Sequence, residues 1–578
     1  MATVTPVAVR PGRGSELGLV VLALGIGIAA FALTGFGTVD ALPDEFTTQA
    51  VTLILLGLGL HLVLRWVAPY ADPVILPVAL MLNGVGLAMI RRLDYAYAVR
   101  QLGRGFADKQ LVWTIIGVVC AACLLIALRD HRTLRRFTYT AMVIGLVLVV
   151  LPMVPGLGVE INGARIWVSI GGISAQPAEF AKIALAIFFA GYLVTNRDTL
   201  SLAGPKILGF HLPRLRDFGP LLLVWLVALA VLVVERDLGT SLLFFGMFVA
   251  MLYLATERVS WVVVGLTLFA GGATAAAMTF GHVAARFDAW LHALEPEVFD
   301  RVGGSGQLVR GLYGLASGGL FGTGLGDGRP DLVPYAESDF IVASLGEELG
   351  LVGLMALLVC YLVLAERGVR AALGARDGFG KLLAGGLAFI MAWQCFVVVG
   401  GVTRLIPLTG LTMPFLAYGG SSILANWLVV ALLLRISNIA RNPAAPAAAV
   451  SGAFGRSRRA VLDDDVIDEP DDVADSVGDV ADELVYDTQP TPEPTDDLET
   501  QVVTPLDLTT SRADLAAALA AQGFRTGELP TASADDPAPT GTDEPAPADT
   551  GAPAPADESP PARTAETAIV TPPEEESQ

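Results

Sequence analysis

Three carboxylates gather where one predicted membrane helix begins. Asp339 ends a polar run that starts at Pro334, and the apolar stretch Ile341 to Leu364 that follows contains Glu347 and Glu348. Ionisable side chains are costly in lipid, and within membrane segments they usually serve function. The sequence therefore predicts an integral membrane protein whose chemistry lies at one face of the bilayer.

The spacing of these carboxylates separates them around the helix. Asp339 stands at the helix start, where a negative charge is favourable, so it is either a simple helix cap or a catalytic group. Glu347 lies about 12 Å further along and about 80° around the axis, while Glu348 falls on nearly the opposite side. We expect Glu347, rather than Glu348, to face the same cavity as Asp339.

A second polar cluster opens another predicted span. Glu179 and Lys182 follow Pro177, and their i,i+3 spacing lets them pair on one helix face. A structural ion pair and a functional pair are both open on this evidence. The connection before them contains Arg165 and Trp167.

The long loop from Gly281 to Asp339 holds a glycine-rich run, Gly318 to Gly328. Its glycine spacings come near a nucleotide fingerprint, but no strand-turn-helix pattern surrounds them and the chain has no Walker sequence. We expect no nucleotide and no nucleic acid as ligands. Close approach of this backbone to a phosphate or sugar, or a merely flexible loop, remain as alternatives.

Twelve apolar segments are near the roughly 20 residues that a membrane helix needs. They are Leu17 to Phe36, Ala50 to Leu64, Val74 to Ile90, Leu111 to Leu128, Phe137 to Val154, Pro177 to Val194, Phe218 to Val234, Leu242 to Ala255, Trp261 to Phe280, Phe340 to Leu364, Leu382 to Val402 and Ser421 to Ile436. The arginine-rich loops on the side of the termini predict that both termini are cytoplasmic, because basic loops stay inside.

Several arginines nevertheless fall in the loops of the predicted outer side. They either bind an anion, for which a guanidinium is well suited, or are solvated loop charges. These residues are Arg91, Arg92, Arg100, Arg104, Arg165, Arg286, Arg301, Arg310, Arg329 and Arg404.

The charge of the chain is divided between two regions. The whole carries a net charge of −20, but Val461 to Gln578 contain 30 acidic and 3 basic residues. This end is rich in Pro, Ala, Thr and acids and poor in aromatics, so it cannot bury enough apolar surface to fold. The four cysteines lie in apolar runs and indicate neither disulfides nor a metal site.

Three blocks together resemble the SEDS family (shape, elongation, division and sporulation). They are Asn162 to Lys182, Gly318 to Gly350 and Leu405 to Ser422, and the turn Glu235 to Thr240 resembles a further family motif with Arg236 in place of Pro. Among the branches, residues 326–331 and 400–404 are most similar to actinobacterial RodA.

The resemblance implies an all-α polytopic membrane protein with a ten-helix core. The expected organisation is a cytoplasmic N-terminus (1–16), an extra N-terminal transmembrane pair (17–73), the core (74–441) and a disordered acidic cytoplasmic tail (442–578).

The implied activity is a peptidoglycan glycosyltransferase of the bacterial cytoplasmic membrane, which polymerises lipid II with a class B penicillin-binding transpeptidase as partner. Asp339 falls on the family's essential acidic position, and an inverting reaction needs one general base. A divalent cation, Mg²⁺ or Mn²⁺, is a possible cofactor, with unknown ligands. The candidate substrate-binding residues are Arg165, Trp167, Glu179, Lys182, Gln307, Glu347, Tyr418, Ser421 and Ser422.

Some positions depart from the family pattern, and two other functions stay open. Gly306 and Arg310 stand where an aromatic and a small polar residue are common, and Ala417 stands where Ser is common. A lipid II flippase would place coupling residues near the membrane midplane, whereas these motifs crowd one surface. A non-catalytic scaffold would depend on its acidic tail.

Overall fold

The computed structural model describes residues 12–100, 105–161, 163–201, 206–207, 210–211 and 215–442. The predicted tail beyond residue 442 and most of the predicted N-terminal segment lie outside these residues. Asn162 and Arg104 lie outside them as well.

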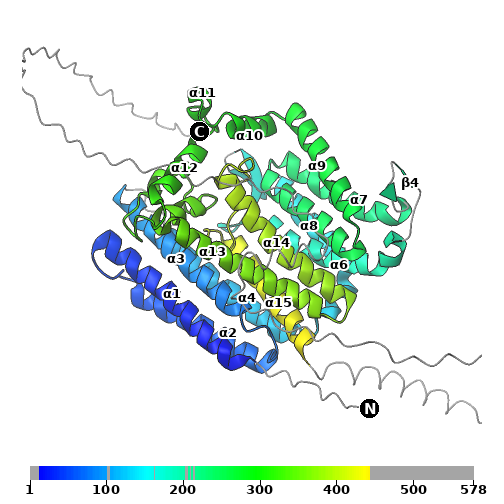
Figure 1. Ribbon diagram of the computed structural model, residues 1–578, viewed down its shortest axis with the longest axis horizontal. Coiled ribbons are helices and arrows are strands. Elements are labelled where there is room, and N and C mark those ends of the chain that lie inside the picture. The colour runs from blue at the N-terminus through cyan, green and yellow to red at the C-terminus, as the bar shows by residue number, and fades with distance from the viewer. Residues whose placement is uncertain are drawn as a thin grey trace, which may run out of the picture. The chain divides into compact units, whose positions relative to one another are not determined.

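The described residues form a mostly helical protein (Figure 1). The α-helices are α1 (Arg13–Val39), α2 (Phe46–Val67), α3 (Ile75–Val99), α4 (Phe106–Ala127), α5 (Thr138–Val150), α6 (Ala178–Ser201), α7 (Leu215–Val234), α8 (Leu238–Thr256), α9 (Val259–Thr279), α10 (Gly281–Leu291), α11 (Pro296–Phe299), α12 (Gly306–Gly318), α13 (Ile341–Gly374), α14 (Gly378–Val402) and α15 (Gly420–Arg441). The 3₁₀ helices are η1 (His131–Phe137), η2 (Leu151–Met153) and η3 (Pro330–Leu332), and the strands are β1 (Gly158–Ile161), β2 (Ala164–Ile170), β3 (Ile173–Ala175), β4 (Lys206–Ile207) and β5 (Phe210–His211).

Eleven helices among the described residues are long and apolar enough to cross a membrane. Helix α7 adds a shorter apolar stretch, Leu222–Val231, so the helices correspond to the twelve predicted segments. Helices suit lipid because they satisfy every backbone hydrogen bond internally. The expected all-α membrane fold of about twelve helices is confirmed.

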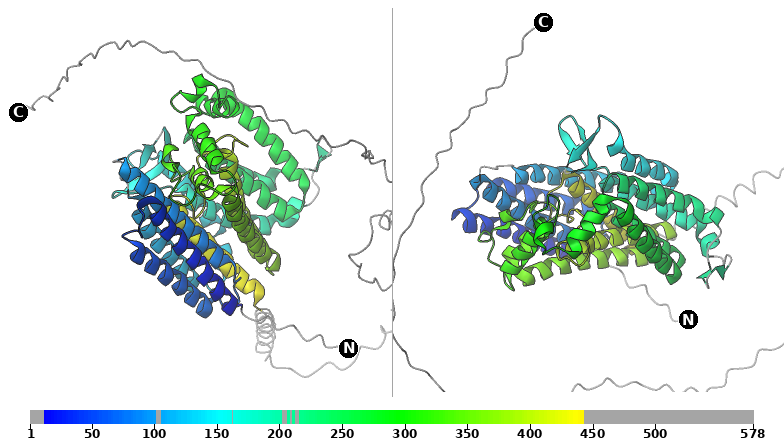
Figure 2. Two further views of the ribbon diagram at one scale, coloured as in Figure 1. Left: turned by 60° about the vertical axis from the view of Figure 1, so that its left-hand side comes forward. Right: turned by 90° about the horizontal axis from the view of Figure 1, so that it is seen from above.

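The helices differ in how far other helices enclose them. In α3, 89% of the most apolar stretch of 18 residues is buried, so α3 lies inside the bundle. In α9, none of the corresponding stretch is buried. Helices α1 and α2 flank the bundle on the side away from α7–α9, as two further views confirm (Figure 2). The membrane-facing surface is correspondingly rich in exposed Leu, Val and Phe.

The N-terminal pair packs closely on the rest of the bundle. Gly27 of α1 meets Gly84 of α3, and a Cβ atom on Gly84 would lie 2.9 Å from the Gly27 Cα. Helix α1 begins at Arg13, four residues before the predicted span, because buried Glu16 is paired there with Arg13 and with His61 of α2. Such pairing lowers the cost of enclosing charged groups.

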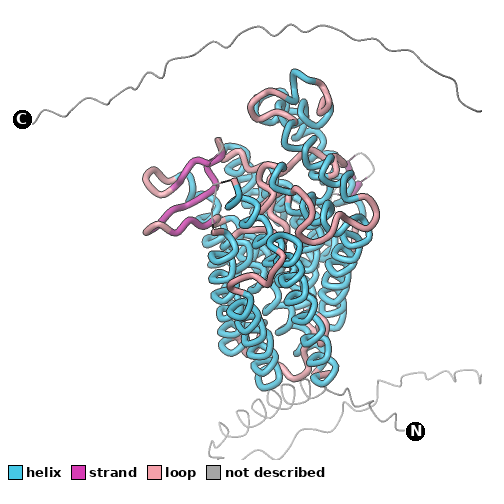
Figure 3. The backbone as a smooth tube through the Cα atoms, turned by 90° about the vertical axis from the view of Figure 1, so that its left-hand side faces the viewer, coloured by secondary structure: helices cyan, strands magenta, loops and turns pink. Residues whose placement is uncertain are grey.

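Two ends of the bundle can be told apart by their contacts. Arg13 donates to the Pro69 carbonyl at 3.0 Å, and Arg441 pairs with Asp72 at 3.4 Å. The first residues of α1 and α3 and the last residues of α15 therefore lie at the same end of the bundle. The strands β1–β3 and the helices α10–α12 gather at the other end (Figure 3). We call the latter the loop end; it also carries Asp339.

Helix α13 corresponds to the predicted span from Phe340 to Leu364, and it is broken at Gly350. Gly350 has φ 68° and ψ −176°, a conformation that is essentially restricted to glycine. The amides of Leu351 and Val352 bond to the carbonyls of Gly319 and Leu320 at 2.9 and 3.0 Å. Non-helical backbone is tolerated at membrane depth only where protein satisfies it in this way.

The sequence did not predict strands, but the connection before α6 forms a three-stranded antiparallel sheet. Its order is β1-β2-β3, and Val168 pairs with Gly158 on one side and Ala175 on the other. Gly163, Gly171 and Gly172 have positive φ and form its turns. The sheet carries Arg165 and Trp167.

We predict that Gly350→Ala lowers the apparent Tm of the purified protein by about 5 °C or more. A side chain in this backbone conformation costs about 1–3 kcal/mol, and the new Cβ would also lie 2.6 Å from the Leu320 carbonyl oxygen. Thermal unfolding in detergent, followed by tryptophan fluorescence, measures the change. Gly25→Ala in α1, where a Cβ meets nothing within 4 Å, is the matched control; equal Tm values for the two variants would contradict the role of the break.

Candidate active site

Asp339 lies on the loop that leads directly into α13, and its side chain is half-buried. Removal of water around the carboxyl raises its pKa to about 6, and the nearby Glu337 carboxylate adds to the rise. A hydrogen bond from Ser338 Oγ, 3.1 Å from Asp339 Oδ1, and the Arg286 guanidinium oppose it. Asp339 is thus ionised at pH 7 yet more basic than an ordinary aspartate, which suits a general base.

Glu337 ties the Asp339 loop to two distant segments. Its carboxylate accepts a hydrogen bond from Tyr97 Oη of α3 at 2.8 Å. Its carbonyl accepts from the amide of Tyr418 at 2.7 Å. The position of Asp339, two residues on, is therefore set by contacts with both α3 and the loop before α15.

Arg286 of α10 connects Asp339 to a second buried carboxylate. Its Nη1 atom donates to the Leu408 carbonyl at 2.8 Å. Its guanidinium interacts electrostatically with both Asp237 and Asp339, while burial lowers its own pKa. An arginine remains charged under such a shift, so Arg286 supplies a positive charge at the site.

The turn between α7 and α8 contributes two further acids. Asp237 caps α8 by accepting from the Thr240 amide at 2.9 Å, and Gln176 Nε2 lies 3.4 Å from its other oxygen. Glu235 is buried, and its Oε1 has no hydrogen-bond partner among the described residues. Burial, together with Asp237, raises the pKa of Glu235 to about 8, so Glu235 is protonated at neutral pH.

Lys182 of α6 is enclosed by acceptors from three helices. Its Nζ atom lies 2.6 Å from Glu179 Oε2, 3.1 Å from Gln394 Oε1 and 3.3 Å from Asn426 Oδ1. The predicted i,i+3 ion pair is confirmed as a buried contact. An ammonium has three N–H donors, and here each has an acceptor within the protein.

The two candidate serines at the start of α15 join the same polar network. Ser422 Oγ accepts from Asn426 Nδ2 at 3.2 Å and lies 3.0 Å from Thr412 Oγ1. Ser421 Oγ accepts from the Gln176 amide at 3.1 Å. Both serines are buried. The hydrogen bond of Ser421 connects the start of α15 to Gln176, which lies just before α6.

Tyr418 and Gln307 lie beside the Asp339 loop. The ring of Tyr418 packs on Phe106, with centroids 4.6 Å apart. Gln307 of α12 donates from Nε2 to the Pro334 carbonyl at 3.2 Å, five residues before Asp339. Both side chains are half-buried, which leaves part of each open to a ligand.

Glu347 and Glu348 both accept hydrogen bonds from the glycine-rich loop, Gly318 to Arg329. Glu347 Oε1 accepts from the Arg329 amide at 2.7 Å, and Glu348 Oε2 accepts from the Gly326 amide at 3.1 Å. Glu348 also pairs with Arg92 at 2.8 Å. Among the described residues, Glu347 makes no hydrogen bond or ion pair with Asp339, and the expectation that the two face one cavity stays a prediction.

Arg165 and Trp167 lie on β2, outside this network. Arg165 is exposed, and its guanidinium makes no hydrogen bond or ion pair with the described residues, although its amide bonds to the Glu235 carbonyl at 3.3 Å. Trp167 is half-buried opposite Val159 of β1. The backbone bond fixes the sheet to the α7–α8 turn and leaves Arg165 available to a ligand.

Most of the other arginines that were expected in outer loops contact the protein itself. Arg91 and Arg92 are buried in α3 rather than in a loop, and Arg91 pairs with Asp108 at 2.5 Å. The remaining contacts are Arg100 with Asp331, Arg301 with Asp288, Arg310 with the ring of Phe299, Arg329 with Asp331, and Arg404 with the carbonyls of Trp290 and Leu291. These contacts explain how the arginines are accommodated.

Arg165 and Trp167 lie on the adjacent sheet. Most of the other predicted site residues are connected by contacts, directly or through intervening residues: Asp339, Glu179, Lys182, Tyr418, Ser421, Ser422 and Gln307. The roles assigned to these residues stay predictions. Neither Glu337 nor Asp237 was predicted as a site residue, and Arg286 was expected only as an arginine of an outer loop. Glu337 had a signal, since it lies in the same polar run as Asp339.

Comparison with known proteins agrees with the motif resemblance. A family model described as "Cell cycle protein" and named for FtsW, RodA and SpoVE matches residues 73–442. The chain is 47% identical over 445 residues to peptidoglycan glycosyltransferase RodA of Mycobacterium tuberculosis, covering 76% of this chain and 94% of that protein. It is 34% identical over 378 residues to stage V sporulation protein E of Bacillus subtilis, covering 64% of this chain and 98% of the relative.

Among solved structures, the rod shape determining protein RodA of Thermus thermophilus aligns with a TM-score of 0.46 and 24% identity, covering 64% of this chain and 98% of that one. The likeness to mycobacterial RodA confirms the expected actinobacterial RodA-like character. On the strength of the family model and these sequence relatives, the chain belongs to the SEDS family of cell cycle proteins, which comprises FtsW, RodA and SpoVE.

Proposed function

We propose that this chain is a peptidoglycan glycosyltransferase that polymerises lipid II into β-1,4 glycan strands with Asp339 as general base. The observation that carries the proposal is the Asp339 carboxyl, half-buried at the loop end, with its pKa raised to about 6 beside Arg286. Peptidoglycan glycosyltransferase is also the name of the mycobacterial relatives that match most of this chain.

The chain is a multi-pass membrane protein, and we propose that its loop end faces the outside of the cytoplasmic membrane. The opposite end carries the arginines of η1 and the last turn of α15, including Arg135, Arg136 and Arg441. Basic residues are retained on the cytoplasmic side. This orientation places both termini in the cytoplasm and Asp339 beside the leaflet where glycan strands grow.

In the proposed reaction, Asp339 accepts the proton of the acceptor 4-hydroxyl as that oxygen attacks the anomeric carbon of the donor sugar. The new C–O bond forms on the face opposite the departing pyrophosphate, which leaves with the electron pair of the broken C–O bond. One displacement converts an α-linked donor into a β-linked product, so one base is sufficient.

Positive charge near the departing pyrophosphate lowers the barrier because negative charge develops there. Arg286 and Arg165 are the cations best placed to serve, since Arg286 lies within electrostatic reach of Asp339 and the Arg165 guanidinium has no partner among the described residues. Lys182 is less suited to this task because its ammonium is already surrounded by three protein acceptors. We assign Lys182 to positioning Asn426, and through it Ser422.

We also propose that a divalent cation, Mg²⁺ or Mn²⁺, accompanies the pyrophosphate. The part of the chain that the structure describes contains no cluster of three or more His, Cys, Asp or Glu side chains that could hold a metal ion. The residues therefore do not by themselves form a metal centre, and no step of the proposed reaction depends on one. A class B penicillin-binding transpeptidase is the proposed partner, as the family resemblance implies.

Asp339→Asn should lower lipid II polymerisation by the purified protein with its partner about 10²- to 10⁴-fold, the contribution of a general base. The amide keeps the shape of the side chain but cannot accept the proton. Gel analysis of labelled glycan strands measures the loss. Asp300→Asn, at an exposed carboxylate in the same long loop, is the matched control, and polymerisation by Asp339→Asn at the rate of this control would rule out the proposed base.

The pH dependence of kcat/KM should report the ionisation of Asp339. Because the base must be deprotonated, kcat/KM falls about tenfold per pH unit below pH 6, where the raised pKa of Asp339 lies. Arg286→Gln removes a charge that lowers this pKa, so the acid limb moves to higher pH. Arg301→Gln, which breaks an exposed ion pair with Asp288, leaves the limb in place; an unmoved limb in Arg286→Gln would refute the coupling.

Arg165→Ala should raise the KM for the lipid-pyrophosphate donor about tenfold or more, because a charge-assisted hydrogen bond contributes roughly 1.5–3 kcal/mol. Arg165→Lys should restore only part of the loss, since lysine lacks the planar fork. Arg310→Ala, which removes an exposed arginine of the same loop end that lies over Phe299, serves as the control. An unchanged KM in Arg165→Ala would make Arg165 a solvated loop charge.

A further inference from the structure

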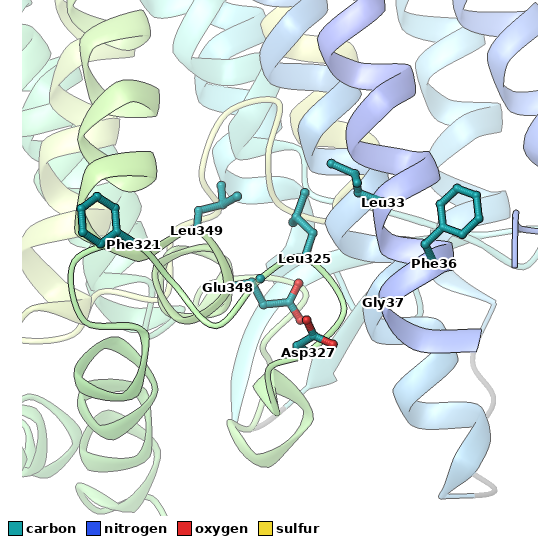
Figure 4. A pocket seen from close by; sticks show the side chains of 9 residues that line it. Leu33, Phe36, Gly37, Phe321, Leu325, Asp327, Glu348 and Leu349 are labelled. Atoms are coloured by element: carbon teal, nitrogen blue, oxygen red, sulfur yellow. The ribbon is translucent and has the colours of Figure 1, made fainter. Parts of the chain in front are cut away.

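A groove of about 440 Å³ lies between the loop-end part of α1 and the glycine-rich loop. Leu33, Phe36 and Gly37 line it from α1, and Phe321, Leu325 and Asp327 line it from the loop (Figure 4). The family match begins at residue 73. The wall formed by α1 is therefore contributed by a helix outside the matched core.

The two walls of the groove are held together by direct backbone contact. A Cβ atom on Gly37 would lie 2.9 Å from the Gly326 Cα, so no larger residue fits there without displacing the loop. The loop is also bound to α13, because the Gly326 amide donates a hydrogen bond to the Glu348 carboxylate. The groove is accordingly part of the folded structure.

The rim of the groove is apolar and exposed. Leu33 is 53% exposed, Phe36 50% and Phe321 81%. Exposed apolar side chains are more stable against hydrocarbon than against water. This rim suits an acyl chain.

The floor of the groove is acidic. Glu348 is satisfied by Arg92 and by the Gly326 amide, whereas Asp327 is exposed and its carboxylate makes no hydrogen bond or ion pair with the described residues. The carboxylates of Asp327 and Glu348 are turned toward one another (Figure 4). With one guanidinium for two carboxylates, the floor favours a cation.

We propose that this groove binds an aminophospholipid, with an acyl chain against Leu33 and Phe36 and the primary ammonium of the headgroup at Asp327. An ammonium offers three N–H donors to a carboxylate that has no protein partner. A phospholipid with only negative charge is repelled by the acidic floor, and a choline headgroup has no N–H to donate. Asp339 does not line the groove, so lipid binding can be measured apart from the glycosyltransferase reaction.

Native mass spectrometry of the full-length protein tests the proposal, with phosphatidylethanolamine and phosphatidylglycerol of identical acyl chains added in equal amounts. We expect the wild-type protein to retain the ethanolamine lipid preferentially. Asp327→Asn should reduce that preference roughly two- to fivefold, the effect of one exposed ion pair. Asp300→Asn, an exposed carboxylate of the same loop outside the groove, should keep it.

Phe36→Ala tests the apolar wall separately. Phe36 is half-exposed, so its truncation leaves the core intact, and it should reduce retention of both lipids alike. Equal retention of the two lipids by the wild-type protein, a preference for phosphatidylglycerol, or an unchanged preference in Asp327→Asn would overturn the proposal.

Discussion

The arrangement of the site depends on one break in a membrane helix. At Gly350, α13 leaves helical geometry, and the amides of Leu351 and Val352 bond to carbonyls of the glycine-rich loop. Unpaired backbone groups are very costly at membrane depth, so the loop and the broken helix require one another. Helix α13 starts two residues after Asp339, so this contact anchors the helix into which the Asp339 loop leads.

Charged groups inside the helix strengthen the same contact. Glu348 would be costly in lipid, but Arg92 of α3 pairs with it at 2.8 Å and the Gly326 amide donates to it. Glu347 accepts from the Arg329 amide. The two carboxylates thus give the glycine-rich loop a defined path, along which Gly326 meets Gly37 of α1. A continuous set of packed segments connects the N-terminal pair to the residue proposed as the base.

The sequence was sufficient for the membrane architecture and for part of the site. Lipid demands long apolar helices, so hydropathy located the spans, and the i,i+3 spacing of Glu179 and Lys182 predicted a pair that the structure contains. Asp339 could be placed at a helix start because a polar run meets an apolar one there. These are local constraints, which a single sequence expresses directly.

Contacts between distant segments could not be predicted in the same way. Helical spacing predicted different surroundings for Glu347 and Glu348. It could not predict that one loop contacts both residues, through the Gly326 amide, more than twenty residues upstream of Glu348, and through the Arg329 amide at Glu347. The proximity of Arg286 to Asp237 and Asp339 joins three separate elements. The sheet before α6 consists of short strands between glycine turns, whose pattern is weak beside that of a membrane helix.

Chemical rescue tests the central claim, that Asp339 acts as the base, most directly. The measurement is the single-turnover rate of lipid II coupling by purified Asp339→Ala protein with formate or chloride added at equal ionic strength. If Asp339 accepts the proton, the variant is inactive in chloride and formate restores part of the rate, because the small carboxylate replaces the missing one. Coupling by Asp339→Ala at the wild-type rate in chloride would contradict the account.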